Sequence, residues 1–424
     1  MTTPLSAKKR CAICLACGQN YIDYTYITVH SIAEHLAEGQ HCEVVILCTG
    51  VADYKKKFFN ELARPNLSIR FYSMDELAET FGLYDFFTSA HITLSAYFRF
   101  FIPQLFSEYD RVLYLDGDII VQTNAMDIFE EELGDSLLGV VRDTGLHNML
   151  DIMESYTAET LHLDWHDYFN AGVLLYNIPR CLEFRLQEKC FEAQKQIKSP
   201  ILHDQDILNT VTRGNTFFLS VRWNFETRHY TPLELKKFQQ HRPQLYEEYL
   251  DAAREPAFLH YAGGDKVWSQ PSLPFAELWW DYARRSPFYE KFMAGVQANS
   301  VSTILASLKE NSERHISTLA KHMEYCLELS KQNSGENTSV LAKHMEYCLQ
   351  NFDKELRTYL QEKEHENRRV FLRIAALSSR RHSLIFLHTA CRLLSHITIG
   401  KLKKKLIAKR QEIKTQLDFL NSWT

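Results

Sequence analysis

The feature that most limits how this chain can fold is an alternation of short apolar runs and amphipathic helical patterns, which continues to about residue 230. Between two of these runs, Val29, Ile32, Ala33 and Leu36 recur at helical spacing and would share one face of a helix. The runs themselves have the length and composition of buried strands: Ile13–Ala16, Val44–Leu47, Ser68–Tyr72, Arg111–Leu115, Leu137–Val141 and Ala171–Tyr176. Strands separated by helices predict an α/β fold with a mostly parallel sheet, whose ligands bind beyond the carboxyl ends of the strands.

Toward the C-terminus, glycine and strand patterns almost disappear and long helical patterns replace them. We therefore predict an α/β domain over residues 1–290 and an all-α region over residues 291–424. One nonapeptide occurs twice, at Leu319–Leu327 and Leu341–Leu349, and the offset of 22 residues is close to six helical turns. Turn-forming residues at 333–337 favour two helices joined by a turn. Their apolar seam could pack on a partner helix, in self-association, or on the chain's own domain.

The net charge of −5 at pH 7 conceals a strong asymmetry. Residues 368–411 contain twelve Lys or Arg and no Asp or Glu, so this segment carries +12 and the rest of the chain −17 (−5 minus 12). Basic residues that alternate with apolar patches are typical of helices on anionic lipid surfaces. We expect this basic tail to bind an anionic membrane surface. The alternative is a basic helix that is solvated or docked on the acidic remainder. No recognised nucleic-acid-binding fold accompanies the tail, so we expect no nucleic-acid partner.

The N-terminal apolar run that follows Lys8–Arg10 has only seven residues, which is short for a signal segment and too short to span a bilayer. We expect a cytoplasmic protein, peripheral on the cytoplasmic face of the inner membrane. Most of the ten cysteines lie in apolar stretches, which is typical of reduced, buried thiols. Cys11, Cys14 and Cys17 form a C-x-x-C-x-x-C string that could suggest an iron–sulfur cluster. No fourth cysteine follows nearby, so we favour buried thiols.

The strongest local signal is an apolar strand that ends on two carboxylates, Asp116 and Asp118, with one glycine between them. Alternate residues of a strand share a face, so both side chains can reach one cation. Mg²⁺ and Mn²⁺ take such oxygen ligands, and either ion can neutralise a diphosphate. Alone this pattern is weak evidence, because an ordinary acidic turn after a strand gives the same string.

Three further segments place polar groups where ligands of an α/β sheet bind. Asn170 stands directly before an apolar strand. Asp204–Asp206 open a helical pattern, in which Asp204 could simply cap the helix. His260–Trp268 combines an imidazole, a paired-glycine turn and Lys266, which could reach a phosphate. The alternative for this last segment is a surface turn with a solvated lysine.

In this order and at these separations, the four segments resemble family 8 of the retaining glycosyltransferases, from about Ile13 to Trp268. That family includes bacterial lipopolysaccharide galactosyl- and glucosyltransferases, and also glycogenin. The resemblance implies the GT-A fold, which binds nucleotide sugars on a single sheet. It also implies a bound Mn²⁺ or Mg²⁺, held by Asp116, Asp118 and His260.

The same resemblance implies a UDP-sugar donor and a role for each matched position. The uracil and ribose are assigned to Ala16, Asn20 and Tyr21. The diphosphate is assigned to Gly263 and Lys266. The hydroxyls of the donor hexose are assigned to Arg99, Asp143, Asn170 and Asp204. Gln205 falls beside the anomeric carbon, and its neighbour Asp206 stays open as a catalytic nucleophile.

The chain is therefore predicted to be a retaining, metal-dependent hexosyltransferase that moves glucose or galactose from a UDP-sugar to a glycan, in the lipopolysaccharide core or another surface glycan. Alternatives are a glycogenin-like or protein-directed glucosyltransferase and a non-catalytic glycan-binding relative. Two other enzyme classes fit less well. A haloacid-dehalogenase-type phosphatase has its Asp-x-Asp near the start of the domain and would leave the His260 segment without a role. A nicotinamide dehydrogenase needs G-x-G-x-x-G after the first strand, where Gly18–Tyr21 stands instead.

Overall fold

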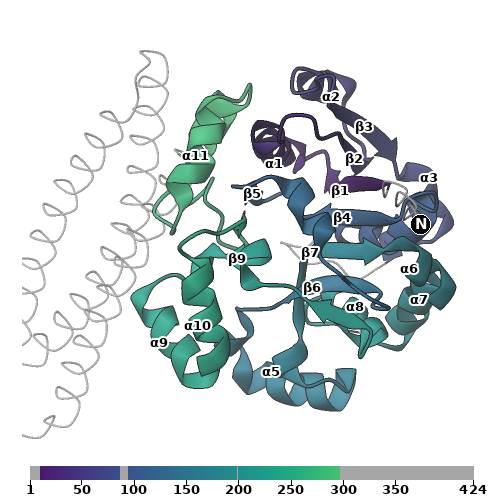
Figure 1. Cartoon of the computed structure of the whole chain (residues 1–424), viewed down its shortest axis with the longest axis vertical. Helices are drawn as coiled ribbons and strands as arrows, with labels where there is room; N and C mark the ends of the chain where they lie inside the picture. Colours follow the sequence, from purple (N-terminus) through teal and green to yellow (C-terminus); the bar gives the residue numbers. More distant parts are fainter. Residues whose placement is uncertain (1–9, 86–93, 198, 297–424) are drawn as a thin grey trace, which may run out of the picture. The chain divides into compact units, whose positions relative to one another are not determined.

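A seven-stranded sheet with helices on both faces forms the centre of the computed structural model, which describes residues 10–85, 94–197 and 199–296 (Figure 1). The strand order is β3-β2-β1-β4-β7-β6-β8. The strands are β1 Cys11–Gly18, β2 Cys42–Thr49, β3 Leu67–Ser73, β4 Arg111–Leu115, β6 Leu138–Arg142, β7 Phe169–Asn177 and β8 Thr216–Phe218. Every neighbouring pair is parallel except the two pairs that β7 makes, which are antiparallel. The predicted mostly parallel, mixed sheet is confirmed.

A second, smaller sheet has the order β5-β10-β9, with β5 Ile119–Val121, β9 Phe225–Glu226 and β10 Phe258–His260. β10 runs antiparallel to β5, and His260 stands opposite Ile119 in this pairing. The sequence analysis did not predict this sheet, because strands of two or three residues are too short to show a periodic pattern. It joins three segments that lie far apart in the chain.

The helices cover the large sheet in two layers. The α-helices are α1 Ile22–His35, α2 Asp53–Asn60, α3 Asp75–Thr80, α4 Ile102–Leu105, α5 Leu150–Tyr156, α6 Ile178–Phe184, α7 Leu186–Gln196, α8 Asp204–Thr212, α9 Pro232–His241, α10 Pro243–Ala252 and α11 Ala276–Arg284. Short helices of other types, one π-helix (η5) and otherwise 3-10 helices, are η1 Leu83–Asp85, η2 Leu94–Phe101, η3 Ala125–Glu130, η4 Leu146–Asn148, η5 Thr157–Leu161, η6 Trp165–Asp167, η7 Val221–Asn224 and η8 Thr227–His229. The predicted helical face at 29–36 falls on α1, where Val29, Ile32 and Ala33 are buried.

The two faces of the large sheet carry separate apolar cores. Successive strand residues point to opposite faces, so Leu15 of β1 belongs to one core while Cys14 belongs to the other. Cys17 lies on the Leu15 face, opposite Cys14. The two thiols therefore cannot bind one iron–sulfur cluster, which agrees with the expectation of buried thiols. Burial raises the pKa of the Cys17 thiol to about 12.

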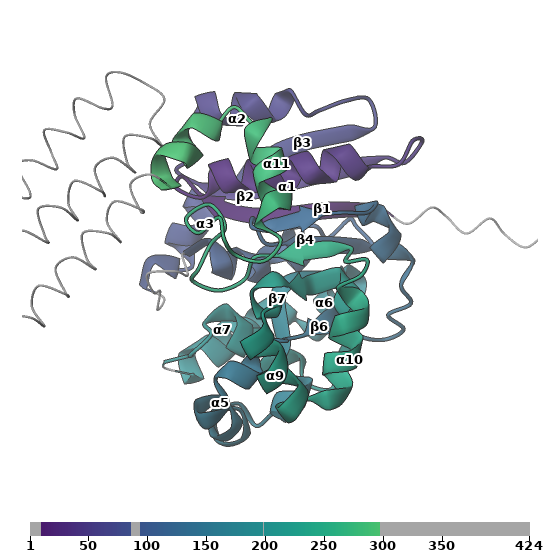
Figure 2. The same cartoon turned by 90° about the vertical axis from the view of Figure 1, so that its left-hand side faces the viewer.

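α11 returns to the beginning of the domain and lies beside α1 (Figure 2). Trp279 of α11 joins an aromatic cluster with Tyr24 of α1, Trp268 and Phe292, with ring centroids between 4.1 and 6.5 Å apart. The neighbouring Trp280 donates a hydrogen bond from Nε1 to the carbonyl oxygen of Val267, at 3.0 Å. α11 thus fixes the segment that directly follows Lys266.

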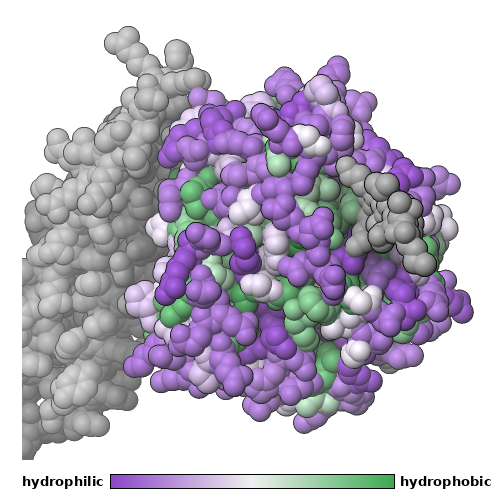
Figure 3. All heavy atoms as spheres, viewed as in Figure 1, coloured by the Kyte–Doolittle hydropathy of each residue, from purple (hydrophilic) through white to green (hydrophobic). Residues whose placement is uncertain are grey.

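Hydrophilic residues dominate the face shown in Figure 3, and hydrophobic residues appear between them in small groups. Among the described residues, no helix combines the length and the apolar content that a bilayer span requires. Residues 297–424 lie outside the described ranges. The predictions for the repeated nonapeptide, the helical region 291–424 and the basic tail therefore stay predictions.

Candidate active site

A cavity of about 690 Å³ opens at the edge of the large sheet where β1, β4 and β6 end and β7 begins. Twelve of the predicted site residues line it: Ala16, Tyr21, Arg99, Asp116, Asp118, Asp143, Asn170, Asp204, Gln205, His260, Gly263 and Lys266. Ligands of α/β sheets bind at such an edge. The sheet therefore brings together side chains that the sequence separates by up to 250 positions (266 minus 16).

The two predicted carboxylate ligands lie in the turn between β4 and β5, not on a strand as the sequence analysis assumed. They still converge, because one ligand atom from each of Asp116, Asp118 and His260 lies within 4.8 Å of the others. His260 Nε2 is 3.4 Å from Asp118 Oδ1 and 3.9 Å from Asp116 Oδ2. Gly117 between them faces α1, where a Cβ atom would lie 2.6 Å from Thr25 Oγ1. The glycine is thus needed for α1 to approach the turn.

A chain of amides fixes the orientation of His260. Its Nδ1 lies 2.8 Å from Asn224 Oδ1, which can only accept a hydrogen bond, so Nδ1 carries the proton and Nε2 is turned to the carboxylates. Asn224 in turn donates from Nδ2 to Asn170 Oδ1, at 2.9 Å. A partner on the second ring nitrogen is the usual arrangement of a metal-bound histidine. Gly172 leaves room for this ring, because a Cβ atom there would overlap it.

Two basic groups accompany the carboxylates. The Lys266 ammonium group forms an ion pair with Asp118 and donates to the carbonyl oxygen of Tyr261, at 2.8 Å. Gly263 has φ +88°, in the region that favours glycine, and a side chain there would overlap the guanidinium group of Arg228. The cavity therefore offers a lysine and an arginine near a backbone turn, which is suited to a diphosphate.

Arg99 of η2 connects the metal-site carboxylates to the start of α8. Its Nη2 lies 2.9 Å from Asp116 Oδ1, and its Nε lies 3.0 Å from Asp204 Oδ2. Its Nη1 donates to the carbonyl oxygen of Ala171. The guanidinium also lies over the ring of Tyr114, 4.4 Å from the centroid. Asp204 is the first residue of α8, and the N-cap position is occupied by His203. The Asp204 side chain therefore does not cap the helix, and it forms an ion pair with Arg99.

The amide of Gln205 is held at both ends. Its Oε1 accepts a hydrogen bond from the Ala171 N–H at 2.8 Å, and its Nε2 donates to Asp143 Oδ2 at 2.9 Å. Asn170 Nδ2 approaches the same Asp143 oxygen at 3.5 Å. The Gln205 amide therefore cannot rotate without breaking its hydrogen bonds to Ala171 and Asp143.

Burial shifts the protonation of the cavity carboxyls in different directions. It raises the pKa of Asp204 to about 7, although Arg99 opposes the shift, and the pKa of Asp143 to about 6, where Glu226 adds to it. Burial would also raise the pKa of Asp118, but the charges of Lys266 and His260 hold it well below its usual range. Asp118 thus stays charged beside its cations, whereas the pKa values of Asp143 and Asp204 lie close to neutral pH.

Two predicted site residues lie outside the cavity lining. Asn20 is exposed in the turn between β1 and α1. Asp206 is fully buried, and its carboxylate accepts hydrogen bonds from the hydroxyls of Tyr156 and Tyr168 and from the Leu202 N–H. The structure therefore places Asp206 among tyrosines and outside the cavity lining.

The segment 222–229 was not predicted from the sequence, although it supplies Asn224 and three residues of the cavity lining, Glu226, Arg228 and His229. Glu226 Oε1 accepts a hydrogen bond from the Thr144 N–H at 3.0 Å, which ties this segment to the end of β6. A signal was present, because polar and ionisable residues alternate with aromatic ones over residues 222–226, which is the two-residue period of a strand.

The family model for glycosyl transferase family 8 matches residues 12–271, a range that includes all the cavity residues described above. The chain belongs to this family. Among similar proteins, general stress protein A of Bacillus subtilis is 25% identical over 263 residues, which cover 59% of this chain and 85% of the relative. The lipopolysaccharide 1,3-galactosyltransferase of Salmonella typhimurium is 28% identical over 239 residues, with coverages of 54% and 62%. The lipopolysaccharide 1,2-glucosyltransferase of Escherichia coli is 31% identical over 184 residues, with coverages of 41% and 50%.

Solved structures of glycosyltransferases share the fold. WbbM, a bifunctional glycosyltransferase in its apo form, has a TM-score of 0.57 and 25% identity, covering 69% of this chain and 53% of WbbM. The galactosyltransferase LgtC, solved with donor and acceptor sugar analogues, has a TM-score of 0.54 and 23% identity, covering 65% of this chain and 96% of LgtC. The predicted GT-A fold of a family 8 glycosyltransferase is thereby confirmed.

Proposed function

We propose that this family 8 glycosyltransferase is a retaining, divalent-metal-dependent hexosyltransferase that transfers glucose or galactose from a UDP-sugar to a glycan. The observation that carries the proposal is the convergence of Asp116, Asp118 and His260 beside Lys266 in one cavity. Family membership and the similarity to two lipopolysaccharide hexosyltransferases support the reaction class.

The three convergent residues fit Mn²⁺ or Mg²⁺. Two carboxylates and one imidazole form a donor set that suits Mn²⁺, and Asn224 presents the lone pair of His260 Nε2 to the carboxylates. The bound ion would supply positive charge that stabilises the departing diphosphate. Lys266 would add a second cation to the same phosphate, once the diphosphate replaces its present partner Asp118.

The other cavity residues would bind the donor from one end to the other. Ala16 and Tyr21, with Asn20 at the exposed turn, would contact the uracil and ribose, and Gly263 would let the backbone approach the diphosphate. The hexose hydroxyls would be bound by four buried polar residues: Arg99, Asp143, Asn170 and Asp204.

Retention of configuration is proposed to proceed by attack on the same face as the leaving group. A double displacement needs a carboxylate nucleophile below the anomeric carbon. Gln205 is a poor nucleophile, and its two hydrogen bonds fix the amide where it can stabilise developing positive charge. The leaving phosphate would then accept the proton of the acceptor hydroxyl. Asp206 would act as a positioning residue for α8, because its carboxylate binds Tyr156 and Tyr168.

The acceptor is proposed to be a glycan linked to lipid, such as the lipopolysaccharide core. Two relatives carry lipopolysaccharide transferase names, and the basic segment 368–411 would hold the enzyme on the anionic cytoplasmic face of a membrane. A glycogenin-like or protein-directed glucosyltransferase stays the alternative for the acceptor.

Release of UDP from UDP-glucose and UDP-galactose, with and without Mn²⁺, tests the proposal. We expect metal-dependent release, and we expect Asp118→Asn to remove nearly all of it, because the loss of a primary contact to the metal costs several kcal/mol in the transition state. His166→Gln, which changes an exposed histidine away from the cavity lining, is the control. Release that is equally fast after complete removal of divalent metal would contradict the metal role, and a β-linked product in NMR spectra would contradict retention.

A further inference from the structure

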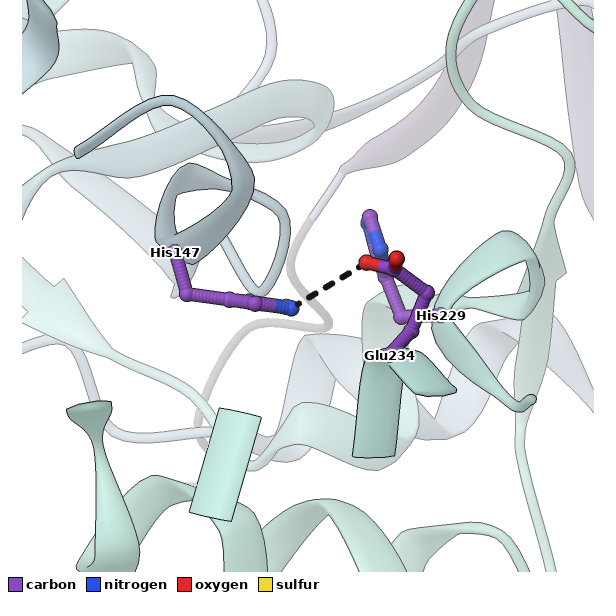
Figure 4. Close-up of side chains that lie close together, drawn as sticks. All are labelled: His147, His229 and Glu234. Carbon is purple, nitrogen blue, oxygen red and sulfur yellow. Dashed lines mark ion pairs between the residues drawn. The ribbon is translucent and has the colours of Figure 1, made fainter. Parts of the chain in front are cut away.

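A second cluster of metal-binding side chains lies beside the cavity and takes no part in the proposed transfer. It consists of His147 of η4, His229 of η8 and Glu234 of α9 (Figure 4). One ligand atom from each of the three lies within 4.8 Å of the others. The three residues come from separate elements, so only the folded chain brings them together.

Two acceptor atoms of this cluster, one from His147 and one from Glu234, face each other with no hydrogen bond between them. His147 Nδ1 lies 2.8 Å from the carbonyl oxygen of Thr144, which can only accept, so Nδ1 carries the proton and Nε2 presents a lone pair. This Nε2 points at Glu234 Oε2, 3.6 Å away (Figure 4). Both atoms are buried and have no hydrogen-bond partner. Two desolvated acceptors aimed at each other are unfavourable unless a metal ion or a proton lies between them, and 3.6 Å is too long for a hydrogen bond.

The surroundings hold the His147 ring in this direction. The imidazole is completely buried and stacks on Phe238 of α9, with ring centroids 4.8 Å apart and planes 4° from parallel. The second oxygen of Glu234 is engaged by Lys237 at 3.1 Å, which leaves Oε2 as the oxygen that faces the histidine. The arrangement is therefore built by packing and does not depend on a mobile surface side chain.

His229 completes a nitrogen-rich donor set. Its Nε2 lies 3.3 Å from Glu226 Oε2, and its Nδ1 lies 3.3 Å from Asn148 Nδ2. An amide nitrogen donates, so Nδ1 has the lone pair and Nε2–H is held by a carboxylate. Histidines that bind metals characteristically donate their other ring N–H to a carboxylate or a backbone carbonyl. His147 and His229 both have such a partner, Thr144 and Glu226.

We propose that His147, His229 and Glu234 bind a zinc ion that is separate from the metal of the Asp116 site. Zinc is held by two histidines and a glutamate in proteins with one coordination position left open. Tetrahedral bonds of about 2.0–2.1 Å place ligand atoms roughly 3.3 Å apart, close to the 3.6 Å between His147 Nε2 and Glu234 Oε2. A ring nitrogen of His229 lies within 4.8 Å of the other two ligand atoms, and Nδ1 would exchange its contact with Asn148 Nδ2 for the ion.

The zinc ion would join α9 to two elements, η4 and η8, that line the cavity. Asn148 of η4 and His229 of η8 line the cavity, and Glu226 and Arg228 lie next to His229 in sequence or space. α9 itself contributes Glu234 and carries Phe238 against His147. The ion would therefore act on the shape of the binding cavity and not on the reacting bonds.

Zinc titration of the full chain tests the proposal, with Asp116→Asn and Asp118→Asn present in every sample to disable the first site. The metal-free protein competes for Zn²⁺ against a chromogenic chelator. Adding Glu234→Gln, which preserves the shape of a partly exposed side chain, should remove one high-affinity zinc per chain. Removing even an outer-shell partner of a metal ligand lowers metal affinity by about 10- to 100-fold. We expect the loss of the ligand Glu234 to lower the affinity for zinc by at least this factor. His147→Gln should give the same loss.

His166→Gln is the matched control, because His166 is an exposed histidine that pairs with Asp164 at 2.7 Å. It should leave zinc binding unchanged, and near-ultraviolet circular dichroism should show the same folded state in all variants. Equal zinc binding with and without Glu234→Gln would overturn the proposal. So would a metal-free protein in which NMR shows a protonated His147 paired with Glu234 and no zinc uptake. Since the first site is disabled throughout, failure of metal-dependent hexose transfer would not change this comparison.

Discussion

At the scale of single residues, the candidate metal site depends on places where a side chain is absent. Gly172 of β7 faces the His260 imidazole so closely that any Cβ atom there would overlap the ring. Gly117 allows α1 to approach the turn that carries both carboxylates. Both positions therefore require glycine for steric reasons: Gly172 leaves room for the His260 ring, and Gly117 leaves room for α1.

Gly172→Ala should weaken metal binding as the loss of a metal ligand would, although Gly172 itself has no side chain that could bind the metal. The added methyl group pushes His260 away from Asp118, so the Mn²⁺ concentration needed for half-maximal transfer should rise by about 10- to 100-fold. The measurement is the rate of UDP release against Mn²⁺ concentration. Gly295→Ala, at a position where nothing lies within 4 Å of the added atom, is the control. An unchanged metal requirement would show that His260 is not a ligand.

Asp204 should make the protein less stable as the pH rises. Its pKa is about 7 in the folded protein, above the ordinary 3.8, so the folded state keeps a proton that the unfolded state releases. The stability that this proton contributes is present at low pH and lost as the pH rises toward and through 7. Asp204→Asn has no such titration. Its free energy of unfolding, relative to the unchanged protein, should therefore rise by up to a few kcal/mol between about pH 5 and about pH 8.

Chemical denaturation at both pH values measures this difference, and Asp53→Asn, an exposed carboxyl on α2, provides the control. A difference between Asp204→Asn and the unchanged protein that does not vary with pH would mean that Asp204 is ionised throughout.

At the residue level, sequence reasoning found the groups that stand in short, distinctive strings. Asp118, Asn170 and His260 each end or begin an apolar run, so their place at the sheet edge follows from the pattern. Asn224 was missed because only a long-range contact brings it to His260. Asp206 was chosen for its closeness to Gln205 in sequence, but consecutive helical residues point about 100° apart, and its carboxylate faces tyrosines instead.

At the scale of elements, α11 holds the loop that carries Lys266, although this loop precedes the helix in the chain. Trp280 holds the Val267 carbonyl at 3.0 Å, one residue after Lys266. This helix lies beyond the end of the family match at residue 271. A helix outside the matched range thus positions a residue that we propose to bind the diphosphate.

Trp280→Phe should weaken donor binding with little loss of stability. It removes a hydrogen bond worth about 0.5–1.5 kcal/mol, so the loop that carries Lys266 is less well held, and the Kd for UDP measured by calorimetry should rise several-fold. Tyr282→Phe on the same helix removes a contact to His35 that lies far from the loop, and it should leave UDP binding unchanged. Equal effects of the two substitutions would indicate a general loosening of α11.

The long elements were predictable and the short ones were not. All six predicted strands exist, and five of them are buried along their length, whereas the run Ser68–Tyr72 of β3 is only partly buried. The strands β5, β8, β9 and β10 have two or three residues and show no period, and their pairing depends on tertiary contacts. The sheet that aligns Asp118 with His260 therefore could not be predicted from the pattern, although both residues were singled out in the sequence.

At the scale of the whole molecule, the basic residues are concentrated outside the part of the sequence that matches the family. The family match ends at residue 271, whereas the basic segment occupies residues 368–411. A chain that ends at Val296 should keep metal-dependent UDP release but lose binding to anionic vesicles, since each Lys or Arg near such a surface contributes about 1 kcal/mol. Co-sedimentation with vesicles at increasing salt measures the attachment. Full-length protein that stays in solution at low salt would contradict a role of the tail in membrane binding.

The antiparallel pairing of β10 with β5 has a consequence for the order of folding. Asp118 and His260 are 142 positions apart (260 minus 118), and they meet only when these two short strands align. Contacts between such distant parts of a chain form slowly, because a long loop must close first. A slip of one residue in this register would turn His260 to the opposite side. The capacity to bind the metal should therefore appear late in refolding, and its appearance would show that β5 and β10 have paired in the correct register.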